Sequence, residues 1–298
     1  MATRHPHRPP AVDDATALAL WAAHQDRLFG VAYRMLGSVA DAQDVLQEAY
    51  LRLRSVEPTQ LHSPGGWLTT VVTRLCLNHL DLARVRRERY VGPWLPEPVE
   101  AMRDVADDVV LAESISAAFL VVLETLSPPE RAAFVLHDVF GHPFGEVAEM
   151  LDRDERACRQ LASRARRAIQ ARRSRFSSDP EQHRAVTERF LAACLGRDLA
   201  ALLEVLAPEV TLHNDGGGQV RAARRVVTGA DPVARFLVGV LTRRSEWTPS
   251  AIEVHGAPGL IWRDPNGAPT AVVSTTVDDH GRVAAVAMVV NPDKLRHL

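Results

Sequence analysis

The chain has 298 residues with 35 basic and 37 acidic side chains, so its formal net charge at pH 7 is −2. The N-terminal segment MATRHPHRPPAVDD has no apolar core and no run of about 18 apolar residues follows, which argues against a signal peptide and a membrane-spanning helix. Three widely spaced cysteines (Cys76, Cys158 and Cys194) argue against a disulfide framework or a metal site, so we expect free buried thiols in a cytoplasmic protein. The motifs HExxH, GxxxxGK(S/T) and GxSxG do not occur, so the common signals of metalloproteases, P-loop proteins and hydrolases are absent.

Residues 12–90 are predicted to be helical throughout. Apolar residues recur at helical spacing over Ala15–Leu36 and Ala40–Arg54, and a third helix is expected from Trp67 to about Arg89. Gly37 and Ser38 separate the first two helices, and Pro64-Gly65-Gly66 precedes the third.

Two faces of these helices carry polar patterns. Asp41, Asp44 and Glu48 share one side of the second helix and predict an exposed acidic patch, although an ordinary solvated face would look the same. The third helix combines an aromatic, an amide and basic residues, a pattern that suits single-stranded nucleic acid. These residues are Trp67, Arg74, Asn78, Arg84, Arg86, Arg87 and Arg89. Trp67 could equally be a core residue.

Residues 91–112 are predicted to be a stiff linker followed by acids. Pro93, Pro96 and Pro98 favour an extended chain. From Glu97 to Glu113 the sequence has six acids and one arginine.

Residues 113–176 are predicted to be a second helical unit that ends in a helix-turn-helix. A short apolar-faced helix over Pro143–Leu151 is followed by a turn, and Asp154 is a good N-cap for a helix that begins at Glu155. That helix has a buried stripe at four-residue spacing, made of Ala157, Leu161, Ala165 and Ile169. Without its charge, the pattern would also fit an ordinary helical hairpin.

The charge of this second helix indicates a polyanion as its partner. Residues 153–175 carry nine arginines and only two acids, and such concentration is typical of nucleic-acid binding. Arginine and glutamine near the helix N-terminus can bond guanine and adenine edges in the major groove. The expected DNA-reading residues are Arg153, Arg156, Arg159, Gln160, Arg164 and Arg167, and Arg172, Arg173 and Arg175 suit phosphates.

Residues 181–298 are predicted to be an α+β domain. Two helices are expected over Glu181–Leu195 and Asp198–Ala207, and a meandering sheet follows. Its expected strands are Glu209–Asn214, Ser250–His255, Leu260–Asp264, Thr270–Asp278 and Val283–Asn291.

Several motifs carry a resemblance to a known family. DAQDVLQEAYLRL, WLTTVVTRLCLNHL and LSPPERAAFVLHDVFGHPFGEVAEML, in this order, resemble the extracytoplasmic-function (ECF) sigma factors over roughly residues 12–175. Three further motifs resemble signatures of the SigJ-like subgroup, which carries a fused SnoaL-like domain of the NTF2 fold. They are WLPEP (Trp94, Leu95, Pro96, Glu97, Pro98), DGGG (Asp215, Gly216, Gly217, Gly218) and NPDKL (Asn291, Pro292, Asp293, Lys294, Leu295).

The resemblance implies a multidomain chain with two all-α sigma domains and a C-terminal α+β cone. Region 2, a helical bundle, would span residues 12–90, the linker 91–112, region 4 with its helix-turn-helix 113–176, and the SnoaL-like domain 181–298.

The resemblance also implies residue roles in starting transcription at specific promoters. Asp41, Asp44, Gln47 and Glu48 would dock on the coiled coil of the largest subunit of RNA polymerase, and region 4 would also touch the flap. The Trp67–Arg89 helix would bind the −10 promoter element, and the helix-turn-helix would read the −35 element. The sequence departs from the family pattern at Gln43, Asn78, Asp152 and Gln219.

The C-terminal domain is expected to act as a built-in regulator without catalysis or a cofactor. Its DGGG and NPDKL motifs would lie near the linker motif, and its pocket could hold a small ligand. SnoaL-like folds include enzymes, however, and His213, Asp215 and His255 would be the candidate acid/base residues. Two alternatives therefore stay open: a SnoaL-type cyclase or isomerase fused to a DNA-binding module, and a one-component DNA-binding regulator.

Overall fold

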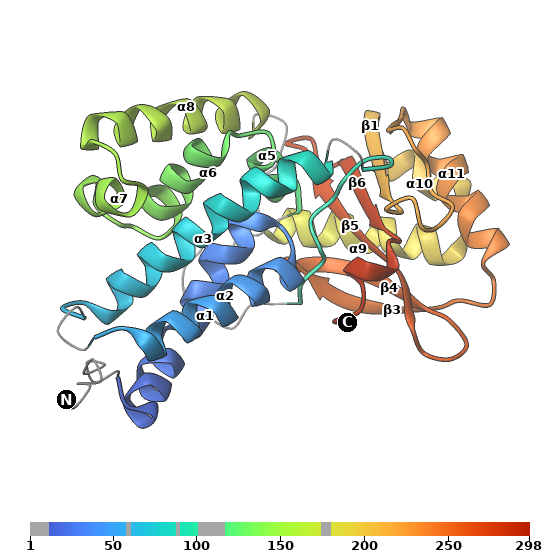
Figure 1. Ribbon diagram of the computed structural model, residues 1–298. Helices are drawn as coiled ribbons and strands as arrows, with labels where there is room; N and C mark the ends of the chain where they lie inside the picture. Colours follow the sequence, from blue (N-terminus) through green and yellow to red (C-terminus); the bar gives the residue numbers. More distant parts are fainter. Residues whose placement is uncertain (1–11, 58–60, 88–89, 101–116, 174–179) are drawn as a thin grey trace, which may run out of the picture.

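The N-terminal unit consists of three packed helices. The computed structural model describes residues 12–57, 61–87, 90–100, 117–173 and 180–298, without the side chains of 83–87, 117–118, 172–173 and 180. The three helices are α1 (Asp14–Leu36), α2 (Val39–Ser55) and α3 (Pro64–Arg87) (Figure 1). Gly37 ends α1 in the left-handed conformation with φ 67°, and the Ser38 hydroxyl caps α2 by accepting from the Asp41 amide. The Gly-Ser pair therefore makes the predicted break between them.

The second helical unit packs directly on the first. It contains α5 (Ala117–Leu123), α6 (Pro128–Phe134), the π-helical turn η3 (Val135–Val139), α7 (Phe144–Leu151) and α8 (Glu155–Arg173). One continuous apolar core joins the two units and includes Leu28, Val72 and Leu136. Arg131 is buried in this junction, where it donates to the Met35 carbonyl at 2.6 Å and to Glu124 at 2.7 Å. Burial lowers the pKa of its guanidinium to about 10.

A mixed sheet and three helices form the C-terminal unit. The helices are α9 (Pro180–Gly196), α10 (Leu199–Val205) and α11 (Ala230–Arg243). The strands are β1 (Leu206–Asp215), β2 (Val227–Thr228), β3 (Thr248–Val254), β4 (Ala257–Arg263), β5 (Pro269–Val277) and β6 (Val283–Val289), and the turn η4 (Pro292–Lys294) follows them. The strand order is β2-β1-β6-β5-β4-β3.

The predicted meander holds only for part of this sheet. Strands β3 to β6 are consecutive antiparallel neighbours, but β1 pairs in parallel with β6, because α11 and the intervening hairpins carry the chain across the sheet. The second predicted helix ends at Val205, and β1 begins at Leu206. Helix α11 and strand β2 were not predicted.

The two faces of the sheet have different covers. Helices α9, α10 and α11 pack on one face, around Leu212, Trp262 and Met288. On the other face Val272 and Val289 contact Leu95 of the linker. The linker therefore crosses the sheet face that looks toward the helical units (Figure 1). Within the described ranges, no helix is long and apolar enough to cross a membrane.

Candidate nucleic-acid interface and interdomain junction

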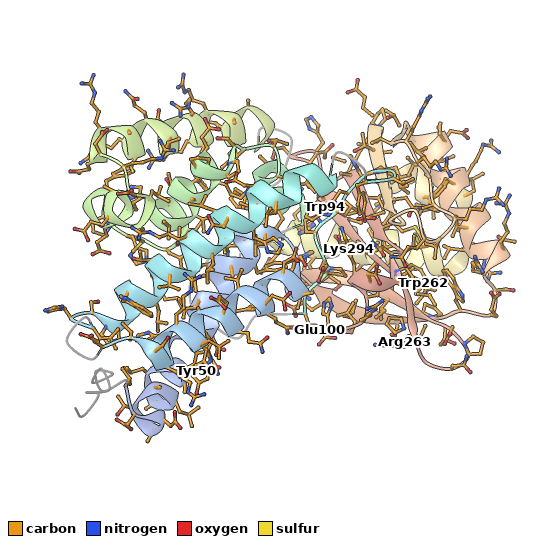
Figure 2. The ribbon with its side chains drawn as sticks, in the orientation of Figure 1. Tyr50, Trp94, Glu100, Trp262, Arg263 and Lys294 are labelled. Carbon is orange, nitrogen blue, oxygen red and sulfur yellow. The ribbon has the colours of Figure 1, made fainter. Side chains whose placement is uncertain are left out.

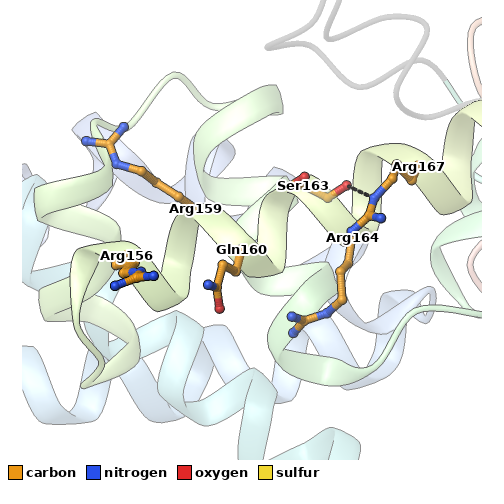
Figure 3. Close-up of a pocket in the computed structure, with 6 residues that line it drawn as sticks. All are labelled: Arg156, Arg159, Gln160, Ser163, Arg164 and Arg167. Carbon is orange, nitrogen blue, oxygen red and sulfur yellow. Dashed lines mark hydrogen bonds between the residues drawn. The ribbon is translucent and has the colours of Figure 1, made fainter.

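Helix α8 presents a row of basic and amide side chains. Arg156, Gln160 and Arg164 follow at four-residue spacing and point to the same side of the helix, whereas Arg159 leaves on another side (Figure 3). An open hollow of about 480 Å³ lies along this row. Its lining residues are Arg156, Arg159, Gln160, Ser163, Arg164 and Arg167. Arg153 is also exposed, in the turn just before the helix. The structure therefore gathers the predicted DNA-reading residues at one exposed site.

Helix α7 and a tight turn hold α8 in place. Asp152 ends α7 in the left-handed conformation with φ 52°, which aspartate tolerates better than most residues. The Asp154 carboxylate accepts from the Ala157 amide at 2.7 Å and caps α8 as predicted. Leu161, Ala165 and Ile169 of the predicted stripe are buried, as are Cys158 and Ala162, while Ala157 is half-buried.

The side chains of this face differ in how they are engaged. Arg159 pairs with Glu155 and lies 4.8 Å from the Phe144 ring centre. Arg164 pairs with Glu130 at 2.6 Å. Arg156 and Gln160 form no ion pair or hydrogen bond with the part of the chain that the structure describes. Their donors can therefore bind a ligand without breaking an internal contact.

Helix α3 is partly occupied by the second helical unit. The Arg74 guanidinium donates to the carbonyls of Glu149 at 3.0 Å and Met150 at 3.2 Å, at the end of α7. Asn78 is exposed one turn farther along, and Trp67 packs half-buried against the shared core. Arg84, Arg86 and Arg87 lie on the last turns of α3, but their side chains are outside the described part of the structure. Arg89 lies outside the described residues altogether.

The predicted acidic patch lies on α2. Asp44, Gln47 and Glu48 are exposed on one side of this helix, and Glu48 pairs with Arg52 at 2.9 Å. Asp41 is half-buried, with its carboxylate 3.1 Å from the His79 imidazole of α3. The patch is therefore open at three of its four predicted residues.

A buried carboxylate joins the linker to the C-terminal unit. Asp215, at the end of β1, is fully buried and accepts from the Tyr90 hydroxyl at 2.5 Å, the Leu95 amide at 2.8 Å and the Lys294 ammonium at 2.8 Å. Lys294 also donates to the Leu95 carbonyl and lies 4.1 Å from the Trp94 ring centre (Figure 2). Burial, and then the hydrogen bond to Asp215, raise the pKa of Tyr90. The WLPEP, DGGG and NPDKL motifs thus meet at one buried ion pair.

The rest of these motifs complete the junction. Asn291 donates to the Tyr90 hydroxyl at 3.0 Å and accepts from the Asp293 amide. Gln219 donates to Asp293. Gly217 and Gly218 adopt positive φ, as expected for a turn after Asp215. Of the remaining motif residues, Pro96, Pro98, Gly216 and Leu295 are buried in the same region, whereas Pro292 is exposed.

Glu97 attaches the linker to the first helical unit. Its buried carboxylate accepts from the Ser38 hydroxyl at 2.8 Å and the Val39 amide at 2.7 Å, so that it caps the N-terminus of α2, where a negative charge is favourable. Its own amide donates to the Gly37 carbonyl at 2.9 Å.

A third contact joins α1 directly to the sheet. The Tyr33 hydroxyl donates to the Glu97 carbonyl at 2.6 Å and lies 2.9 Å from His255 Nε2. Because the Tyr33 hydrogen is used, Nε2 must carry the proton. His255 Nδ1 is buried without a hydrogen-bond partner in the described structure, and burial lowers the pKa of His255 to about 4.

The three candidate acid/base residues do not share one site. Asp215 and His255 are buried in separate contacts of the junction, and His213 is half-buried, with its pKa lowered by burial. The hollow between the linker and the sheet, beside His255, has a volume of only about 10 Å³, because Leu95, Pro96 and Pro98 fill it.

Several junction residues were not predicted. Tyr33, Gly37, Tyr90 and His297 all contact the linker or its partners, and His297 lies 2.7 Å from the Pro98 carbonyl. Their partners are distant in sequence, so only the position of Tyr90 just before the WLPEP motif offered a signal.

Comparisons with known proteins agree with this architecture. Family models for Sigma-70 region 2 and Sigma-70 region 4 match residues 20–86 and 116–169. The chain is 43% identical to the ECF RNA polymerase sigma factor SigJ of Mycobacterium tuberculosis over 285 residues, 91% of each chain. It is 36% identical to the probable ECF RNA polymerase sigma factor SigI of the same species over 286 residues, 93% of this chain and 94% of SigI.

A solved structure extends the likeness to the whole fold. The crystal structure of M. tuberculosis SigJ matches with a TM-score of 0.75 at 40% identity, and covers 94% of this chain and 98% of that one. The predicted arrangement of two helical sigma units followed by a C-terminal α+β domain is confirmed. The chain therefore belongs to the ECF RNA polymerase sigma factors, which act in transcription initiation.

Proposed function

We propose that this sigma factor directs core RNA polymerase to promoters whose −35 element it reads with α8. The observation that carries the proposal is the exposed row of Arg156, Gln160 and Arg164 on the second helix of a helix-turn-helix. In this motif the second helix enters the major groove, where arginine can bond guanine and glutamine can bond adenine. Arg167 and Arg153, at the two ends of the row, suit the phosphate backbone.

The α2 face is the proposed docking site for the coiled coil of the largest polymerase subunit. Asp44, Gln47 and Glu48 are exposed together, and like charges gathered on one rigid helix steer a basic partner. Asp41 would belong to this site only after its contact with His79 changes. We propose that the second helical unit also touches the polymerase flap.

Helix α3 is proposed to bind the −10 element. In the described arrangement, contacts with α7 occupy part of its DNA-binding face. Two of the five N–H donors of Arg74 already bond the α7 carbonyls, so the whole guanidinium becomes available to DNA only when the two helical units separate. On the −35 face, by contrast, Arg156 and Gln160 are exposed and bond nothing in the described part of the chain. The two promoter elements would therefore be engaged in order, the −35 element first.

The C-terminal domain is the proposed regulator of this opening. It holds the linker through Asp215 and Lys294, and holds α1 through His255 and Tyr33. A ligand or partner with different affinity for the closed and open forms would shift the balance between them. A small molecule that binds the C-terminal domain is one such ligand. The acidic residues of the linker lie largely in 101–116, outside the described residues.

We also propose that the protein works in the cytoplasm, where RNA polymerase acts, and that its C-terminal domain has no catalytic role of its own. Supporting the second point, Asp215 and His255 are already committed to the interdomain junction. A SnoaL-type enzyme would instead need a carboxylate or imidazole that faces an open pocket.

Run-off transcription tests the proposal. The template is the DNA upstream of the protein's own gene, and the reaction contains core polymerase with wild type, with R156A/Q160A, or with no sigma factor. A specific transcript that needs wild type and is weakened by R156A/Q160A supports the proposal. Tight promoter binding without polymerase and no transcript would favour a one-component regulator, and neither transcript nor DNA binding would favour an enzyme.

A further inference from the structure

The loop that joins β1 to β2 carries a concentrated positive charge. Residues 216–226 contain Arg221, Arg224 and Arg225 and no acidic residue. All three arginines are exposed, and none forms an ion pair or a hydrogen bond with the described part of the chain. The basic loop, as we call residues 216–226, therefore has three guanidinium groups available to a polyanion.

The basic loop is held on a fixed base. A Cβ at Gly216 would lie 2.6 Å from the Ala222 side chain, so the loop folds tightly back on itself there. Ala222 packs against the C-terminal core, and Gln219 bonds Asp293. Because Ala222 and Gln219 attach it to the domain, the loop displays its arginines from a defined position.

The basic loop lies beside the residues that follow α3. A Cβ at Gly218 would lie 3.1 Å from the Val91 side chain, and one at Gly92 would lie 3.7 Å from Arg224 Cα. Tyr90 is fixed to Asp215 at 2.5 Å. Only two residues lie between Arg87, the end of α3, and Tyr90, so their Cα atoms are three steps along the chain and at most about 11 Å apart.

Two basic segments are thereby brought together. The end of α3 and the residues just after it contain Arg84, Arg86, Arg87 and Arg89, and the basic loop adds three more arginines at the same end of that helix. Since the contacts are made to residues 90–92, directly after α3, the loop stays near the end of α3 as long as Tyr90 remains bound to Asp215, even when the two helical units separate.

From this placement we infer that the C-terminal domain itself contacts promoter DNA, through Arg221, Arg224 and Arg225 on phosphates next to the segment held by α3. The inference rests on the proposed function, because it presumes that α3 binds the −10 element. Guanidinium groups bind phosphates with charge-assisted, often bidentate hydrogen bonds. Such contacts add affinity and fix position but read no base.

The test compares holoenzymes built with wild type, R221Q/R224Q/R225Q or the control R184Q/R189Q/R243Q. The control removes the same charge from exposed arginines on α9 and the far end of α11. Promoter affinity is measured from about 50 to 200 mM salt. If all three arginines contact phosphates, the ratio of wild-type to test-variant promoter affinity falls by about 40-fold as the salt concentration rises across this range. The control keeps the wild-type slope.

Each remaining outcome has a definite meaning. A charge-preserving variant, R221K/R224K/R225K, should keep most of the affinity, which separates lost charge from a damaged fold. A test variant with the wild-type affinity and salt slope overturns the inference and leaves the proposed function standing. Weaker binding to core polymerase with an unchanged DNA slope also overturns it, in favour of a polymerase contact. If wild-type holoenzyme forms no promoter-specific complex, the proposed function itself fails.

Discussion

The carboxylate of Asp215 and the ammonium of Lys294 meet at 2.8 Å in the buried junction between the linker and the C-terminal sheet. Lys294 is 6% exposed and Asp215 has no exposed surface, so water cannot replace either partner. Both groups also bond the Leu95 backbone. The pair is therefore the point at which the linker is fixed to the domain.

Replacing Lys294 by methionine should open this junction. The change leaves Asp215 buried without its cation, and breaking a buried ion pair in this way costs about 3–5 kcal/mol. We expect a lower unfolding temperature and faster proteolysis of the linker than in wild type. D215N/K294M should be less destabilised than K294M, because it no longer buries an unpaired charge. Equal stability of K294M and wild type would contradict this account.

The same pair offers a direct readout of opening. Lys294 is the only lysine in the chain, so amine labelling reports on this residue and the N-terminus alone. We expect slow labelling of Lys294 in wild type and labelling at least about tenfold faster in D215N, since about 1.4 kcal/mol of lost stabilisation raises the open population tenfold. Labelling of the N-terminal amine serves as the internal control. Equal Lys294 rates in the two proteins would contradict the anchoring role of Asp215.

Gly37 should tolerate alanine much less well than Gly141. Both have left-handed φ, 67° and 74°, so each substitution carries a backbone cost of about 1–2 kcal/mol. At Gly37 the new Cβ would also lie 2.6 Å from the Trp94 ring, whereas at Gly141 nothing lies within 4 Å. Urea unfolding of G37A and G141A should show a larger loss for G37A, with faster Lys294 labelling in that variant alone.

Much of the helical part could be predicted from the sequence, because its signals are local. The Gly37-Ser38 break, the Asp154 cap and the stripe through Leu161 and Ile169 all depend on residues within a few turns of one another. Helix α11 is equally local, with Val233, Leu237 and Leu241 buried on one side at helical spacing, so this unpredicted helix also has a signal in the sequence.

The junction could be predicted only in outline. The resemblance placed WLPEP near the other two motifs, but Tyr33 and His255 are 222 residues apart, and no spacing rule connects them. His255 and Gly256 both adopt positive φ in a two-residue turn between β3 and β4. Such turns usually use Asn-Gly or Asp-Gly, so the His-Gly turn gave a weak signal. The parallel pairing of β1 with β6 is likewise a long-range outcome.

Charge reversal on α2 should weaken binding to core polymerase. D44R/E48R replaces two exposed acids of the proposed docking face, and like-charge contact with a basic partner should reduce affinity roughly tenfold or more at low salt. The difference should shrink as salt rises. E188R, an exposed reversal on α9, should bind core polymerase like wild type. Equal weakening of both variants would point to a general charge effect instead of a docking face.

On α8, Arg156 and Arg167 should respond differently to alanine. If Arg156 bonds a base edge, R156A should cost about 1–3 kcal/mol of promoter affinity and relax specificity at one −35 position. If Arg167 bonds a phosphate, R167A should weaken all sequences alike and lower the salt slope by about 1. Holoenzyme binding to a −35 substitution series measures both effects. If R156A loses the same affinity for every −35 sequence, Arg156 does not read a base.

Acid should weaken the closed arrangement through His255. Burial lowers the pKa of its imidazole to about 4, whereas the unfolded chain takes up this proton near pH 6.5. Because the unfolded state binds the extra proton first, stability falls as the pH falls from about 6.5 toward 4, by at most about 3 kcal/mol. Above pH 6.5 the effect is absent. Nε2 already faces the Tyr33 hydroxyl and the Glu97 carbonyl, so the added proton would sit on Nδ1, which is buried without an acceptor in the described structure.

H255Q isolates this contribution. Glutamine stays neutral and keeps an amide donor toward Tyr33. The free energy of unfolding of H255Q, measured in urea, should therefore fall less than that of wild type between pH 7 and pH 5. His183 also has a pKa lowered by burial, but it bonds the Thr275 carbonyl and not the junction. H183Q is therefore the control, and its junction should keep most of the wild-type acid sensitivity. The rate of linker proteolysis, measured at both pH values, separates opening of the junction from global unfolding. If H255Q and wild type lose the same free energy over this range, protonation of His255 is not coupled to closure.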